Sequence, residues 1–150
     1  MGMRKYAITG TDTNTAATTQ VGMTATAAVR PELYDVLVSS VATPADNCCE
    51  FFVQRHTAAG TSTGFTPVAL DSGDPASTTT AGVNHTVEPT YTASSIPLRV
   101  AVNQRNTLRW VARDGSEIRC PATAANGVSF LANAIGGSAV TQAYTWLFGE

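Results

Sequence analysis

Apolar and polar residues alternate in short runs along most of the chain, which is the pattern of β-strands with one buried face. The strictest alternation lies in 96–105, where Ile96, Leu98, Val100 and Val102 share one face. Further runs of strand character are 1–9, 21–29, 33–42, 48–57, 107–113, 127–135 and 139–148. The chain is therefore expected to be built from short strands.

Turn residues separate these runs and predict how the strands are joined. The sequence TPADN (43–47) lies between two runs rich in β-branched and aromatic residues, so we expect 33–57 to form a β-hairpin. Asp114-Gly115 is a second hairpin signal, leading into 116–122, and Gly136-Gly137 predicts a turn before the last strand.

The stretch 56–92 is rich in Thr, Ala, Ser and Gly and is almost free of charge. Its β-branched threonines and its prolines Pro67, Pro75 and Pro89 exclude a helix. We expect short extended pieces and turns, anchored by single apolar residues.

These patterns predict an all-β fold, a single β-sandwich or jelly roll of about eight to ten short strands. Residues 10–19 (GTDTNTAATT) are polar and Thr-rich, so we expect 1–20 to be an extended N-terminal arm and 21–150 the sandwich domain. Lys5 is the only lysine, and lysine normally protects strand edges, so oligomerisation through open edges is expected.

Composition narrows the possible partners. The 150 residues are 43% hydrophobic, enough for one domain with a core, but only 13% are charged and the net charge is −2. With no basic stripe and no long apolar run, neither direct nucleic-acid binding nor a membrane helix is expected. No apolar segment follows the basic residues of the N-terminus, which favours a protein made and kept in a cytoplasm.

Arginine is the other basic residue, and it clusters late in the chain. Such residues favour an interface, because arginine tolerates partial burial and binds carboxylates in a bidentate way. The alternatives are a lineage bias in composition, or solvated strand faces with local pairing to Glu117 or Asp114. The clustered residues are Arg99, Arg105, Arg109, Arg113 and Arg119.

Residues able to support catalysis are sparse. His56 and His85 are interpreted as surface or hydrogen-bonded polar residues, although either could act as a base. Ser72, His85 and Asp74 lack the sequence context of a nucleophile, so no catalytic residues are expected.

Metal and phosphate sites are not expected either, and no cofactor is predicted. Asp71 and Asp74 resemble a fragment of a calcium loop but lack the further ligands, which favours turn capping. The glycine-rich 60–64 precedes no helix. Neighbouring Cys48 and Cys49 would point to opposite faces of a strand, so only one could meet Cys120; free thiols are favoured over a disulfide, which the sequence leaves open.

Three segments of the chain resemble a known group of proteins: RHTAAGTSTGFTPVALDSGDPASTTTAG, NHTVEPTYT and NQRNTLRWVARDGSEIRCPATAANG. They resemble the head decoration, or cement, proteins of tailed bacteriophages, from about residue 20 onward. The three cysteines depart from that group, which has small residues at these positions.

The resemblance implies a structural virion protein on the capsid surface, assembled in the host cytoplasm, that binds the major capsid protein as a homotrimer. We expect 4–19 and 58–92 to reach across subunits. The candidate interface residues are Arg4, Lys5, Tyr6, Arg99, Arg105, Arg109 and Arg113.

Two other classes of function remain open at this point. A phage tail or baseplate module that binds a host surface or glycan would expose Tyr91, Trp110 and Trp146. A small enzyme would gather His56 or His85 with Asp71 in a deep pocket.

Overall fold

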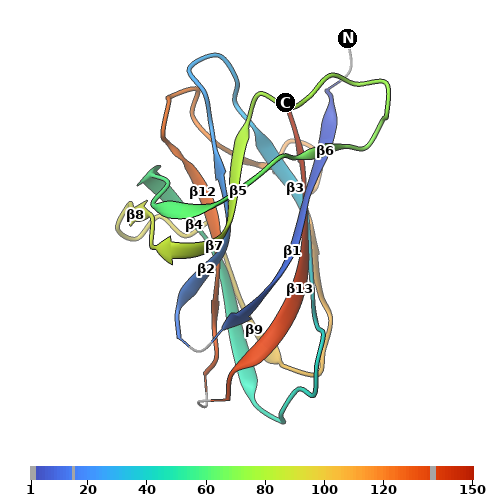
Figure 1. Cartoon of the computed structure of the whole chain (residues 1–150), viewed down its shortest axis with the longest axis vertical. Helices are drawn as coiled ribbons and strands as arrows, with labels where there is room; N and C mark the ends of the chain where they lie inside the picture. Colours follow the sequence, from blue (N-terminus) through green and yellow to red (C-terminus); the bar gives the residue numbers. More distant parts are fainter. Residues whose placement is uncertain (1–2, 15, 136–137) are drawn as a thin grey trace.

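The chain folds into two antiparallel sheets packed face to face, as the computed structural model shows for residues 3–14, 16–135 and 138–150 (Figure 1). Sheet A contains β1 (Lys5–Asn14), β3 (Glu32–Ser40), β6 (Val68–Ala69), β10 (Leu108–Val111), β11 (Ile118–Arg119) and β13 (Val140–Gly149). Sheet B contains β2 (Thr18–Thr24), β4 (Cys48–Ala58), β5 (Thr61–Phe65), β7 (Thr80–Val87), β8 (Thr90–Tyr91), β9 (Leu98–Asn103) and β12 (Gly127–Asn133).

The predicted all-β sandwich is confirmed. Thirteen strands and no helix occupy the described residues, and β6, β8 and β11 are only two residues long, which leaves ten longer strands. Accordingly, none of the described segments is a helix long and apolar enough to cross a membrane.

Strands that are distant in sequence lie next to one another. The order in sheet A is β10-β3-β13-β1-β6, with β11 also beside β3. The order in sheet B is β5-β7-β2-β12-β4-β8, with β9 also beside β4. The first and last strands therefore pair in sheet A, from Lys5↔Gly149 to Asn14↔Val140, and the two ends of the chain lie close together (Figure 1).

Aromatic side chains fill the space between the sheets. Trp146 of β13 meets the ring of Phe130 of β12 edge to face, with centroids 5.8 Å apart, and Phe130 stacks on Phe51 of β4 at 5.5 Å. Tyr6 stacks on Phe148 at 5.5 Å within sheet A. Truncating one such ring typically costs about 3–5 kcal/mol. The Trp146–Phe130 contact joins the two sheets, while the other two pairs each pack within one sheet.

The extended N-terminal arm is not confirmed. Residues 5–14 form β1, which pairs with β13 over its whole length, and Tyr6 and Ile8 are fully buried. The polar composition of 10–14 misled the prediction, because Thr11 and Thr13 face solvent while Asn14 faces inward, as strand geometry allows.

The hairpin predicted for 33–57 is wrong in its pairing. Both runs are strands, but β3 belongs to sheet A and β4 to sheet B. Each run is apolar on both faces, so its sequence suits a central position in either sheet and does not specify the neighbour. The turn at 43–47 crosses from one sheet to the other.

The predicted hairpin at Asp114-Gly115 is also wrong, although the turn exists. Strands β10 and β11 both pair with β3, so 112–117 is an excursion along one edge. The Ser116 N–H donates to the carbonyl of Arg113 at 2.8 Å. Gly115 has φ +80°, a conformation that glycine adopts readily. The turn predicted at Gly136-Gly137 lies outside the described residues.

The stretch 56–92 is not helical, as predicted. It ends β4 and then supplies β5, β6, β7 and β8, with Pro67 between β5 of sheet B and β6 of sheet A. This segment therefore links the two sheets on one side of the sandwich.

Candidate contact surface

Three of the clustered arginines are engaged within the chain. Arg99 lies 3.4 Å from Glu50, Arg109 lies 2.7 Å from Asp35, and Arg119 lies 2.7 Å from Glu32. Arg109 binds the Asp35 carboxylate with both Nε and an Nη atom, and Arg119 also reaches Glu117, as the local-pairing interpretation anticipated. Each of these arginines therefore pairs mainly with a carboxylate of its own sheet.

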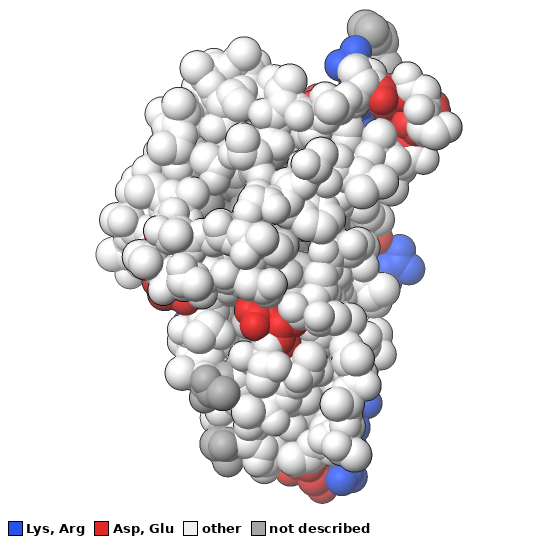
Figure 2. All heavy atoms as spheres, viewed as in Figure 1, with Lys and Arg blue, Asp and Glu red and all other residues white. Residues whose placement is uncertain are grey.

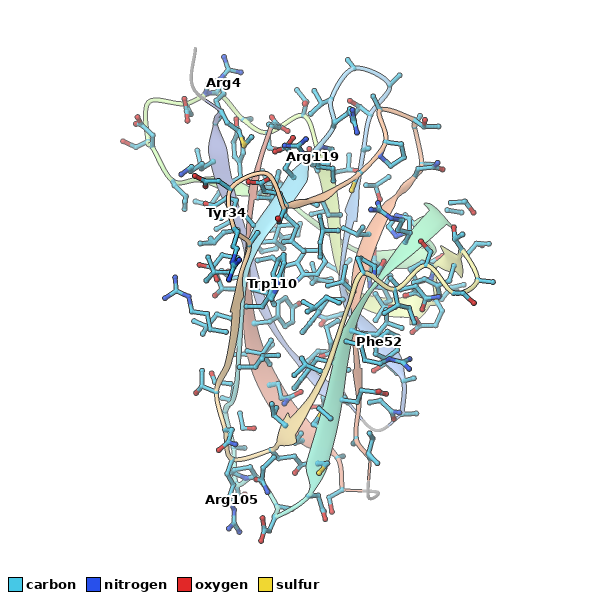
Figure 3. All side chains as sticks on the ribbon, turned by 180° about the vertical axis from the view of Figure 1, so that it is seen from behind. Arg4, Tyr34, Phe52, Arg105, Trp110 and Arg119 are labelled. Carbon is cyan, nitrogen blue, oxygen red and sulfur yellow. The ribbon has the colours of Figure 1, made fainter. Side chains whose placement is uncertain are left out.

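Arg105 and Arg113 differ from the other three. Both are exposed, and among the described residues neither has an ion-pair partner within 4.0 Å. Arg105 follows β9 and Arg113 follows β10, so the two residues flank β10; Figure 3 shows Arg105 at the end of the molecule opposite Arg4. Their guanidinium groups are available to another molecule.

The structure separates the three candidate residues of the N-terminal segment. Tyr6 is fully buried, and its hydroxyl donates to the carbonyl of Pro75 at 3.0 Å, so it is a core residue and not a surface contact. Arg4 lies 4.0 Å from Asp74, and the Lys5 ammonium lies 5.3 Å from the centre of the Tyr34 ring (Figure 3).

Residues 3–5 stand between two shallow hollows. One, of about 380 Å³, is also lined by Tyr34, Val111 and Glu117; the other, of about 400 Å³, is also lined by Leu70 and Asp74. Met3, Val111 and Leu70 are 47%, 55% and 52% exposed at these sites. Exposed apolar side chains beside charged ones are typical of protein-contact surfaces.

The side of the sandwich formed by β1, β6, β5 and β7 is nearly uncharged. Figure 2 shows one acidic group in the middle of this side, with basic side chains only at its rim. From Ile8 to the end of β1, the exposed residues are Thr9, Thr11 and Thr13, and the exposed Lys5 lies at the start of the strand. Burial raises the pKa of the Asp12 carboxylate on this strand, although the Thr13 N–H, which donates to Asp12 Oδ1 at 2.7 Å, opposes that shift.

The outer face of sheet B carries a buried polar cluster. His56 is 2% exposed, its Nδ1 lies 2.8 Å from Ser129 Oγ, and its Nε2 lies 3.3 Å from Thr24 Oγ1. A side chain at Gly127 would place its Cβ 2.6 Å from His56 Nε2, so the imidazole occupies space that only glycine leaves free. This confirms the interpretation of His56 as a hydrogen-bonded polar residue.

A second set of bonds closes the cluster beside β8. Thr19 Oγ1 contacts both Glu88 Oε2 and the Tyr91 hydroxyl, and the Thr19 N–H donates to Glu88 Oε1 at 3.1 Å. Burial raises the pKa of Tyr91 to about 12, so its phenol stays neutral. The segment 88–91 is thereby fastened onto sheet B.

Both histidines are neutral at neutral pH. Burial, together with a smaller contribution from the neighbouring His85, lowers the pKa of His56 to about 4. Burial also lowers the pKa of His85, which packs against Gly22, where a Cβ would lie 3.2 Å from its Nε2. Ser129 is fully buried, so the Ser129–His56 pair has no open access for a substrate.

The structure does not assemble the constellations considered from sequence. Asp71 lines the hollow beside Met3 and Arg4, and Asp74 lies beside Arg4, whereas His85 lies on β7 of sheet B. The Gly73 N–H donates to Asp71 Oδ1 at 2.9 Å, which confirms turn capping. Within the described ranges, no three His, Cys, Asp or Glu side chains gather to hold a metal ion.

The three cysteines are free thiols. Cys48 is exposed and Cys49 buried, so the two point to opposite faces of β4 as predicted. Asn14 Nδ2 donates to Cys49 Sγ at 3.0 Å, and burial raises the pKa of Cys120 to about 12. Neither buried thiol is activated as a nucleophile.

The aromatic residues that would form a glycan platform are not displayed together. Trp146 is fully buried in the core, Trp110 packs partly against the core, and Tyr91 is half-buried with its hydroxyl engaged by Thr19. This removes the feature on which the tail-module alternative depended.

Sequence reasoning missed the polar cluster on sheet B. One signal was present, because Gly22 in β2 and Gly127 at the start of β12 are strand glycines, a pattern that marks the close approach of another group. Comparisons of the chain with protein-family models, curated proteins and solved structures gave no match.

Proposed function

We propose that this chain is a structural virion protein, without enzymatic activity, that binds the major capsid protein on the outside of an icosahedral phage head. It assembles as a trimer and stabilises the head by bridging capsid subunits. The main supporting observation is the broad, nearly uncharged side of the sandwich in Figure 2, which offers extensive contact area with little charge to desolvate.

The shallow relief of the surface agrees with this proposal. The two hollows beside residues 3–5 can each receive a small apolar side chain, and Arg105 and Arg113 can each engage a carboxylate or carbonyl of a neighbour. Each contact is modest, but several copies bound at once can raise avidity by roughly 10²–10⁴. A protein that bridges subunits can therefore bind tightly through many contacts that are each weak.

A rigid body is the second requirement for a bridge between subunits. The contact of Trp146 with Phe130 across the sheets and the pairing of β1 with β13 provide it. Removing 4–19 would delete strand β1 with its buried Tyr6 and Ile8, so surface substitutions are the appropriate way to test binding.

The direct test is sedimentation of the protein with phage heads that lack a decoration layer. We expect saturable binding at a fixed number of copies per head, and a higher temperature of head disruption. The double variant Arg105→Gln/Arg113→Gln should lower occupancy, since both arginines are free in the folded chain.

Arg99→Gln is the matched control, because Arg99 is already engaged by Glu50 and the Phe52 ring, and it should leave occupancy unchanged. Heads that bind no protein under any salt condition would contradict the proposed function.

A further inference from the structure

One edge of sheet A is left unpaired beside β1. Strand β6 covers β1 only at Tyr6 and Ala7, while β1 continues to Asn14. Between Ile8 and Asn14 there is no proline and no lysine, the usual protections of an edge strand. This is the longest unprotected edge in the described part of the chain.

The hydrogen-bond pattern shows which backbone groups are free. Arg4 and Glu150 are bonded to each other by two backbone hydrogen bonds, of 3.1 and 3.0 Å. The backbone N–H and C=O groups of the even-numbered residues of β1 therefore point toward β13. Lys5 correspondingly accepts from Leu70 N–H on the other side, at 2.8 Å. The N–H and C=O groups of Thr9 and Thr11 therefore point away from β13, where no described strand pairs with them.

The opposite edge of sheet A is also open. Strand β10 pairs only with β3 among the described strands. Ala112 N–H donates to Tyr34 at 2.8 Å, so by alternation the backbone groups of Arg109 and Val111 point outward. Both residues are exposed.

The two edges carry opposite charge. Asp12 is the only charged residue between Ile8 and Asn14, so the open stretch of β1 is negatively charged. Arg105, Arg113 and Asp114 are exposed beyond the ends of β10, so the charge that flanks this edge is net positive. Complementary charge of this kind selects partners and orientation.

We propose that the open edge of β1 receives β10 of a second copy of this chain, so that sheet A continues from one copy to the next. This rests on the self-association part of the proposed function. Within one sheet A, β1 and β10 run antiparallel, because three successive antiparallel pairings separate them. Copies related by an axis along the strands would therefore join β1 to β10 in antiparallel fashion, the more stable pairing.

The contact is heterologous, since two different edges meet. A heterologous contact closes into a ring when its rotation divides a full circle. Because the two edges differ, a substitution can block one edge of the chain and leave the other able to bind. Mixtures of two such variants therefore have a predictable outcome.

The test uses proline at outward-facing edge positions, where it removes a free N–H without breaking a bond inside the sheet. Thr11→Pro alters the β1 edge and Val111→Pro alters the β10 edge. We expect wild-type protein to form a ring in light scattering, and each proline variant to be a folded monomer of 15.6 kDa. The dissociation constant should rise by roughly tenfold or more.

Mixing the two variants is the decisive step. The intact β1 edge of Val111→Pro should bind the intact β10 edge of Thr11→Pro and give a dimer that grows no further. Two substitutions serve as controls: Thr11→Ala keeps the N–H, and Ala101→Pro alters the outward edge of β9 in sheet B, so both should keep the wild-type mass.

Wild-type protein that stays monomeric well above micromolar concentration would overturn the inference, as would proline variants that keep the ring or a mixture that stays monomeric. Head binding separates this outcome from the proposed function. A wild-type monomer that still decorates heads rules out only the edge contact, while a ring that binds no head rules out only decoration.

Discussion

The outer faces of the two sheets use polar residues in different ways. On sheet B, His56 and Ser129 are buried and hydrogen-bonded to each other, and the buried Thr19 is bonded to Glu88 and Tyr91 of the segment 88–91. On sheet A, Thr9 and Thr11 are exposed and the strand edge beside them is unpaired. Polar residues thus stabilise the chain on one face and remain available to partners on the other.

This difference separates two kinds of substitution. Changes on sheet B should alter the free energy of unfolding, whereas changes on the edge of sheet A should alter association and leave folding nearly unchanged. The predictions below test this division, in order of decreasing effect.

Gly127→Ala should have the largest effect. The added Cβ would lie 2.0 Å from the backbone carbonyl of Met23 and 2.6 Å from His56 Nε2, so strand β12 must shift. We expect a loss of about 3 kcal/mol in the free energy of unfolding, measured by urea denaturation. Gly64→Ala is the matched control, because a Cβ there meets nothing within 4 Å, and an equal loss in both variants would contradict the packing at His56.

Acidification should destabilise sheet B through His56. Its pKa is about 4 in the folded chain and 6.5 as its ordinary value, so the unfolded chain binds the proton more readily. The stability that His56 contributes is complete above pH 6.5 and is lost as the pH falls toward 4. His85, whose pKa is also lowered, acts in the same direction.

The expected loss from His56 is about 2 kcal/mol between pH 7 and about pH 4.5. Urea denaturation of wild type and His56→Gln at both pH values isolates this contribution. An identical dependence on pH in the two proteins would show that His56 is not held neutral by burial.

Ser129→Ala should cost less, about 1.5 kcal/mol, because it leaves the buried Nδ1 of His56 without its partner at 2.8 Å. Thr57→Ala removes an exposed hydroxyl from the same strand as His56, where the only bond lost among the described residues is the long one to the Thr90 carbonyl at 3.4 Å, and should cost much less. Urea denaturation of both variants would show whether stability depends on the hydrogen bond between His56 and Ser129 or only on the loss of a hydroxyl.

The smallest effect on folding should come from the arginines on and beside strand β10. Arg109→Ala leaves the Asp35 carboxylate, 6% exposed, without its bidentate partner and should lower the urea midpoint slightly. Arg105→Ala should leave that midpoint unchanged while weakening association. A greater loss of stability in Arg105→Ala would contradict its assignment as a free contact residue.

The elements of the fold could be predicted from sequence better than their neighbours. Alternation at Leu98, Val100 and Val102 identified a strand, and the two-sided apolar runs identified β3 and β4. Which sheet received each strand depended on long-range packing, since a run apolar on both faces fits either sheet.

The candidate sites were harder to predict for a related reason. Thr, Asn and Asp in 10–14 suggested a polar arm, because composition does not show that alternate residues face inward beside β13. The fit of His56 over Gly127 joins strands β4 and β12, which are far apart in sequence. Sequence spacing alone carries no information on such a contact.

Electron cryomicroscopy of undecorated phage heads incubated with the protein would test its role most directly. We predict one added layer of density on the outer surface, in threefold groups over the joints between capsid subunits, with sheet A continuous from copy to copy. Heads indistinguishable from untreated ones, or density confined to the tail, would contradict a role in capsid decoration.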